Sequence, residues 1–136
     1  MIKVRIICLL ILILLTNIIY GGAADNIFDG KWCWEHNDKR NYFGVFITMP
    51  TSIYVGSYTM VAYGGNKLDS NDESFQFSKP KGNTVKTKFR AGSLWAFGLV
   101  QLTILSKDKM EWRVLQYPKG EVYVPKKALL NRCDDT

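Results

Sequence analysis

The sequence predicts an all-β protein, a small antiparallel meander barrel of seven or eight strands, with a β-sandwich as the alternative. Aromatic and β-branched residues alternate with polar residues along several short segments, as they do in strands that bury one face. Turn residues recur roughly every eight to twelve positions, a spacing typical of all-β domains. A helix is expected only in the last segment.

The first 24 residues predict a secretory signal peptide. Lys3 and Arg5 precede an apolar run over 6–20, and small residues follow up to Ala24. This order of basic, apolar and small residues is typical of a cleaved leader, and the run is too short to span a bilayer. We therefore expect cleavage before Asp25, a secreted or periplasmic protein without a stable membrane anchor, and one domain over 25–136 with a modest positive charge.

The first half of this domain predicts four strands. Pro50 and the turn sequence Gly64-Gly65-Asn66 mark two of the boundaries. The polar stretch up to Glu73 is expected to form a loop. The four expected strands cover residues 32–35, 42–49, 53–63 and 74–78.

The second half predicts four more strands and a short helix. The clearest strand is 84–90, in which Val85, Thr87 and Phe89 lie on one face. Pro125 suits a first helical position, and good helix formers follow it. The expected elements are strands over 94–105, 110–117 and 121–124, and a helix from Pro125 to Arg132. Glycines 44, 56 and 98 lie inside expected strands and predict bulges or bends of a curved sheet.

The cysteines predict one disulfide. Cys8 lies in the expected leader, which leaves Cys33 and Cys133. An isolated pair in an oxidising compartment is most simply a structural bridge. A metal pair or a redox couple is the alternative, although the two cysteines lack the close spacing that such sites usually have.

Two resemblances bear on the fold. Gly30-Lys31-Trp32 is similar to the Gly-x-Trp with which lipocalins and other calycins open their barrels, where the Trp plugs one end. The whole mature region, from Trp32-Cys33-Trp34-Glu35 to Tyr123-Val124-Pro125-Lys126 and Cys133, is similar in style to small bacterial exported β-proteins of unassigned role. The resemblance implies a lipocalin-like barrel exported by a bacterium, and it implies no activity.

Catalytic chemistry is not indicated. His36 is the only histidine, and it lies in a polar stretch where a triad would need other partners. Asp69, Asp72 and Glu73 share one hydrophilic segment that gives no reason for a raised carboxyl pKa and lacks the ligand pattern of a calcium loop. No cofactor or metal motif is present. We therefore expect a protein that is not an enzyme and that uses neither cofactor nor metal.

A binding protein is the remaining class. A cationic row on one strand could meet an acidic protein, an anionic glycan or a membrane surface, or it could simply protect a strand edge. Nucleic acid is not an expected partner. We expect an exported binding protein, of an inhibitor or immunity type, acting on a protein or another cell-envelope macromolecule. The candidate contacts are His36, Asp38, Arg40, Asp69, Asp72, Glu73, Lys86, Lys88 and Arg90.

The alternative is a lipocalin-like carrier of a small apolar ligand. It requires a hollow barrel, whereas about eight short strands enclose a space that large side chains can fill. The candidate lining residues are Tyr58, Phe97 and Trp112, and ordinary core packing would explain them equally.

Overall fold

The computed structural model describes residues 26–38, 40–92 and 95–133 of the chain. The expected leader and its cleavage site lie outside these residues. Among the described residues, no helix is both long enough and apolar enough to cross a membrane.

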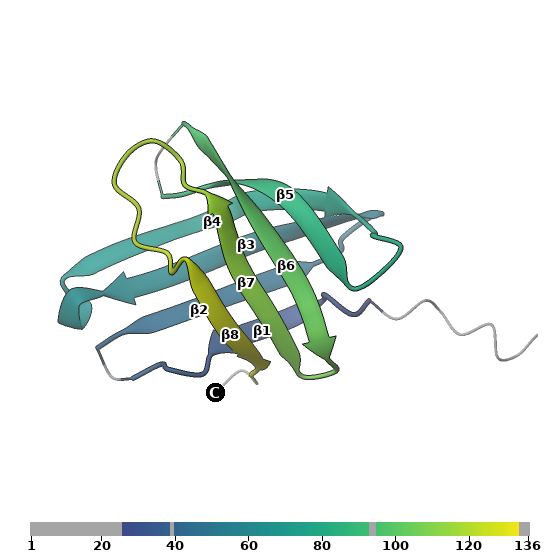
Figure 1. Ribbon diagram of the computed structural model, residues 1–136, viewed down its shortest axis with the longest axis horizontal. Helices are drawn as coiled ribbons and strands as arrows, with labels where there is room; N and C mark the ends of the chain where they lie inside the picture. Colours follow the sequence, from purple (N-terminus) through teal and green to yellow (C-terminus); the bar gives the residue numbers. More distant parts are fainter. Residues whose placement is uncertain (1–25, 39, 93–94, 134–136) are drawn as a thin grey trace, which may run out of the picture.

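Eight antiparallel strands form a closed barrel in which each strand pairs with its neighbours in the chain and β8 pairs with β1. The predicted meander barrel is therefore confirmed. Figure 1 shows β1 to β4 running across the view, with β6 to β8 crossing them steeply in front. The strands are β1 (Gly30–Trp34), β2 (Tyr42–Thr48), β3 (Ile53–Ala62), β4 (Lys67–Ser78), β5 (Thr84–Arg90), β6 (Phe97–Ser106), β7 (Lys109–Gln116) and β8 (Lys127–Arg132), with a short 3-10 turn η1 (Tyr63–Gly65) between β3 and β4.

The predicted C-terminal helix is wrong, because the segment forms β8. Ala128 and Leu130 are buried and their neighbours are more exposed, which is the alternation of a strand. This strand closes the barrel: it pairs with β7 along Lys109–Arg113 and with β1 along Trp32–Trp34. Its backbone groups thereby gain ladder partners on both sides, which outweighs the helix propensity of the side chains.

Two other expected elements also differ. The polar stretch before Ser74 belongs to β4, which pairs with β3 from Lys67 to Asn71 and again from Phe75 to Ser78. The expected strand over 121–124 instead lies in the connection between β7 and β8. At the start of β4, pairing with β3, rather than local composition, decides the outcome.

Aromatic side chains fill the barrel. Trp112 is fully buried, and its ring centroid lies 5.2 Å from that of Phe43, 5.6 Å from that of Phe89, 6.2 Å from that of Phe75 and 6.3 Å from that of Tyr58. These four partners lie on four different strands, β2 to β5, and Trp112 lies on β7, so the cluster joins opposite walls of the barrel.

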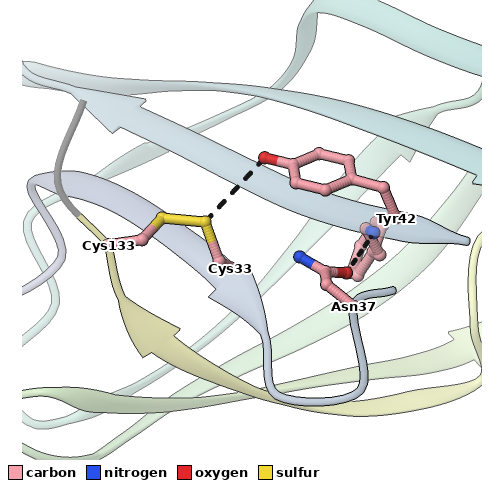
Figure 2. The surroundings of a disulfide bond; sticks show 5 residues. Cys33, Asn37, Tyr42 and Cys133 are labelled. Atoms are coloured by element: carbon pink, nitrogen blue, oxygen red, sulfur yellow. Dashed lines mark hydrogen bonds between the residues drawn. A yellow bond between two sulfur atoms is a disulfide. The ribbon is translucent and has the colours of Figure 1, made fainter. Parts of the chain in front are cut away.

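The disulfide between Cys33 and Cys133 is present and ties the end of the described chain to β1. Figure 2 shows the Tyr42 hydroxyl beside the bridge, with 3.8 Å between the Tyr42 oxygen and Cys33 Sγ, and Asn37 accepting a hydrogen bond from the Phe43 backbone N–H. The bridge reinforces the β1–β8 pairing that closes the barrel. A disulfide of this kind is consistent with an oxidising compartment.

Candidate functional site: a basic groove along the β4–β5 seam

The β4–β5 seam is the least regular join in the barrel. The two strands share one ladder pair, Phe75 with Phe89, whereas β5 pairs with β6 along its whole length. Two side chains bridge part of the seam instead: Ser74 Oγ donates to the Arg90 carbonyl at 2.7 Å, and Thr87 Oγ1 donates to the Gln76 carbonyl at 2.7 Å. The strands therefore stay together while much of their facing backbone lacks a ladder partner.

A groove of about 650 Å³ runs along this seam. β4 and β5 form its walls, and the start of β6 extends it. We call this surface the basic groove. It is lined by Glu73, Ser74, Phe75, Gln76, Lys86, Thr87, Lys88, Arg90, Phe97 and Leu99.

Three cations lie along the groove. Lys86, Lys88 and Arg90 are alternate residues of β5, so their side chains leave the same face of the sheet. No ion pair among the described residues involves any of them. Glu73 is the one carboxylate in the lining, so the groove carries a net positive charge.

Two exposed aromatic residues adjoin the last of these cations. Trp95 is 86% exposed and Phe97 is 58% exposed. The Arg90 guanidinium lies 5.8 Å from the centroid of the Trp95 ring, within the range of a cation–π contact. Phe97 is the β6 residue opposite Arg90. An aromatic and arginine cluster open to solvent has the composition of an interface hot spot.

The three predicted acidic contacts have different surroundings. Asp72 is exposed and Glu73 lines the groove. Asp69 is only 6% exposed and accepts hydrogen bonds from the Tyr58 hydroxyl at 2.6 Å and from the Tyr123 N–H at 3.1 Å. Its carboxylate is therefore occupied inside the protein and serves the structure of the barrel.

Tyr58 completes this buried network. Its oxygen also accepts a hydrogen bond from the Gly92 N–H at 2.8 Å. Burial, followed by the bond to Asp69 and its charge, raises the pKa of Tyr58 well above the usual tyrosine value. Gly92 has a φ of +48°, and a Cβ there would lie 3.0 Å from Asp69 Oδ1. The network thus holds the chain after β5 and the chain before β8 against the barrel wall.

The predicted contacts before β2 do not line the basic groove. Asp38 caps its own turn by accepting the N–H groups of Arg40 and Asn41, both at 2.7 Å, and these bonds lower the pKa of the Asp38 carboxyl. His36 is exposed, with its Nε2 3.3 Å from the Glu35 carboxylate. This turn is an independent surface feature.

The three residues predicted for a ligand cavity do not line one common site. Tyr58 and Trp112 pack into the aromatic cluster of the interior, while Phe97 lies on the outer face beside the basic groove. Within the described residues, no group of three or more His, Cys, Asp or Glu side chains could hold a metal ion.

Sequence reasoning missed Trp95, Gln76 and Leu99 as parts of this surface. Trp95 falls within the expected strand over 94–105, but β6 begins only at Phe97. The register of β6 could have indicated Leu99, because it lies opposite Lys88 on the outer face. No short motif marks any of the three.

Comparisons with known proteins assign no function, so the proposed function rests on the fold and the site. No protein-family model matches the sequence, and neither curated proteins nor solved structures gave a significant match. The lipocalin and exported-protein resemblances remain resemblances. The structure shows a closed eight-stranded meander barrel with one disulfide and a basic groove on one wall.

Proposed function

We propose that this protein is an exported, non-enzymatic binding protein that holds a macromolecular partner in the basic groove, in the manner of an inhibitor or immunity protein. The observation that carries the proposal is the row of Lys86, Lys88 and Arg90 beside the exposed Trp95 and Phe97. Cations steer an acidic partner into place, and exposed aromatic rings supply contact area once it has bound.

A rigid scaffold supports this role. The aromatic cluster around Trp112 includes Phe75 of β4 and Phe89 of β5, the two strands that form the groove walls, and the Cys33–Cys133 bridge holds the barrel closed between β1 and β8. The bridge also favours secretion or a periplasmic location, where disulfides persist. The same aromatic packing favours partner binding over the carrier alternative, because a carrier must leave room for its ligand inside the barrel.

The test is affinity capture from cell-envelope extract with three forms of residues 25–136. The first is the native sequence, and the second carries Lys86→Glu, Lys88→Glu and Arg90→Glu. The third is a control with the same change in charge, placed on exposed lysines outside the groove: Lys107→Glu, Lys109→Glu and Lys119→Glu. Circular dichroism and thermal melting check that all three fold alike.

We expect the native and control forms to retain the same partner and the groove variant to lose it. If all three forms retain the partner equally, the partner does not bind in the basic groove. If no form retains any partner reproducibly, the binding function itself fails.

A further inference from the structure

We propose that the basic groove recognises an extended acidic segment of its partner, which adds to β5 as an extra strand with carboxylates at alternate positions. This inference rests on the proposed function and specifies the chemistry of the partner. It arises from three features of the β4–β5 seam: the spacing of the cations, the backbone that lacks ladder partners, and the apolar contacts opposite the cations.

The spacing of the cations matches an extended peptide. Residues i and i+2 of a strand lie about 6.7 Å apart, so Lys86, Lys88 and Arg90 form a row about 13 Å long. A second extended chain has the same repeat, and its alternate side chains face the same way. Carboxylates at every second position of the ligand would therefore each meet one cation.

The seam supplies backbone for strand addition. From Thr84 to Lys88, β5 has ladder partners on β6 and none on β4, where Phe75–Phe89 is the only pair. The Thr87 side chain takes one β4 carbonyl, that of Gln76, in place of a ladder bond. A sheet edge with groups of this kind is the usual acceptor for an added peptide strand.

Apolar residues of the groove offer the bound segment hydrophobic contacts in addition to the ion pairs. Leu99 lies opposite Lys88 and Phe97 lies opposite Arg90 in the β5–β6 register, on the side of β5 away from the added strand, and both line the groove. Outward-facing side chains of the segment would reach them across β5. Trp95 extends this apolar surface next to Arg90. Exposed ion pairs contribute little binding energy individually, so these contacts and the backbone bonds are needed to hold the segment.

The charge alone would also attract an anionic polysaccharide or an anionic membrane. Neither of these has the peptide repeat, and neither carries the regularly spaced N–H groups that pair with a strand. The peptide is therefore the occupant that uses all three features of the seam, and the other two are competing outcomes of the test.

The experiment measures binding to fluorescein-labelled peptides by fluorescence polarisation, using residues 25–136 with the disulfide formed. The main probe is an eight-residue peptide of alternating Glu and Thr. Its matched control alternates Glu and Pro, which keeps the four carboxylates but removes every second N–H and opposes pairing with a strand. Oligogalacturonate and vesicles containing phosphatidylglycerol serve as unlabelled competitors.

We expect the Glu-Thr peptide to bind at least tenfold more tightly than the Glu-Pro peptide. Lys86→Glu with Lys88→Glu should weaken that binding at least tenfold, and Lys107→Glu with Lys109→Glu should leave it unchanged. Hydrogen exchange should slow at the β5 amides when the Glu-Thr peptide binds. The oligosaccharide and the vesicles should displace the peptide only weakly.

Three results would overturn the inference: no binding of the Glu-Thr peptide, equal binding of both peptides, or displacement by the polysaccharide or vesicles as effective as by unlabelled peptide. If affinity capture still shows a partner that depends on Lys86, Lys88 and Arg90, the proposed function survives and only the strand-addition mode is wrong. If capture fails as well, both proposals fail.

Discussion

At the scale of single residues, one arginine joins several segments of the barrel. The Arg132 guanidinium lies 4.2 Å from the centroid of the fully buried Trp32 ring. It also donates hydrogen bonds to the carbonyls of Ile27 at 3.0 Å, Asp29 at 2.5 Å and Lys107 at 2.7 Å. One planar group thus joins the start of the described chain, β8 and the β6–β7 turn, which a lysine cannot imitate.

We therefore predict that Arg132→Lys lowers the free energy of unfolding by about 1–3 kcal/mol, because several hydrogen bonds to a charged donor are lost. Arg113→Lys is the matched control: Arg113 is more exposed and pairs with Glu111, so its change should cost less than about 1 kcal/mol. Urea unfolding followed by tryptophan fluorescence measures both. Equal effects of the two substitutions would contradict the role given to Arg132.

Tyr58→Phe tests the buried network around Asp69. The change removes the Tyr58 hydrogen bond to Asp69 Oδ1, so that Asp69 keeps only its bond from the Tyr123 N–H, and it leaves the Gly92 N–H without its acceptor. These losses should cost about 1–3 kcal/mol of unfolding free energy at pH 8. The pKa of Tyr58 is raised in the folded protein. Its contribution is therefore complete below the unfolded tyrosine pKa of about 10 and declines as the pH rises above that value.

The difference in stability between the native protein and Tyr58→Phe should accordingly shrink between pH 8 and pH 11. Denaturant unfolding at both pH values gives the two differences directly. The other tyrosines titrate in both proteins and cancel in the comparison. A difference that stays constant or grows would contradict the raised pKa.

At the scale of elements, pairing between strands decided what the sequence alone left open. The sequence pattern correctly predicted β2, β3, β5 and β7, in each of which one face of the strand is more buried than the other. The polar start of β4 and the helix-forming residues of β8 have misleading local composition. Their strand structure depends on partners distant in the chain, and a local pattern does not contain those partners.

The three glycines inside strands were expected at bulges or bends, and this holds for two of them. Gly56 adjoins an irregularity in the β3–β4 register, as predicted, and Gly98 lies next to one in the β6–β7 register. Gly44 lies in a regular stretch of β2, where the Tyr42 ring covers its face. Its small size therefore serves close packing and not a bend.

We predict that Gly56→Ala destabilises the barrel by about 1–3 kcal/mol, because the added methyl group would overlap the Phe75 ring, which is packed in the core. Gly82→Ala is the control, since a Cβ there meets nothing within 4 Å. Chemical denaturation compares the two variants with the native protein. If both variants were as stable as the native protein, the close contact of Phe75 with Gly56 would be wrong.

At the scale of the whole molecule, one covalent bond and one ladder close the barrel together. Cys33 and Cys133 are 100 positions apart in the sequence. The Cys133 N–H also donates to the Lys31 carbonyl at 3.0 Å, which extends the β1–β8 contact to the bridge. The sequence predicted this pair from cysteine count and spacing, whereas the strand that brings the pair together was expected to be a helix.

Replacing both cysteines with alanine should lower the free energy of unfolding by about 2–5 kcal/mol. Loop closure over about 100 residues accounts for about 4.7 kcal/mol in the chain-entropy model, less any strain in the folded state. Guanidinium unfolding of the double variant and of the oxidised native protein measures the difference. A loss below about 1 kcal/mol would mean that the β1–β8 ladder alone holds the barrel closed.

The basic groove was only partly predictable. The cationic row follows from alternation along 84–90, which places Lys86, Lys88 and Arg90 on one face. The groove also needs the irregular β4–β5 seam and the exposure of Trp95 and Phe97. Those features depend on where strands begin and on how they pair around the barrel, so the sequence placed the cations without showing what surrounds them.

Site-specific photo-cross-linking tests the central claim, that the partner binds in the basic groove, most directly. A benzophenone amino acid replaces Trp95 in one protein and Leu105 in another. Both residues are exposed; Trp95 lies two positions before β6, and Leu105 lies near the end of β6. The proteins are irradiated in cell-envelope extract. The account predicts a cross-linked partner from position 95 and none from position 105. Equal cross-linking from both positions, or cross-linking only from position 105, would contradict it.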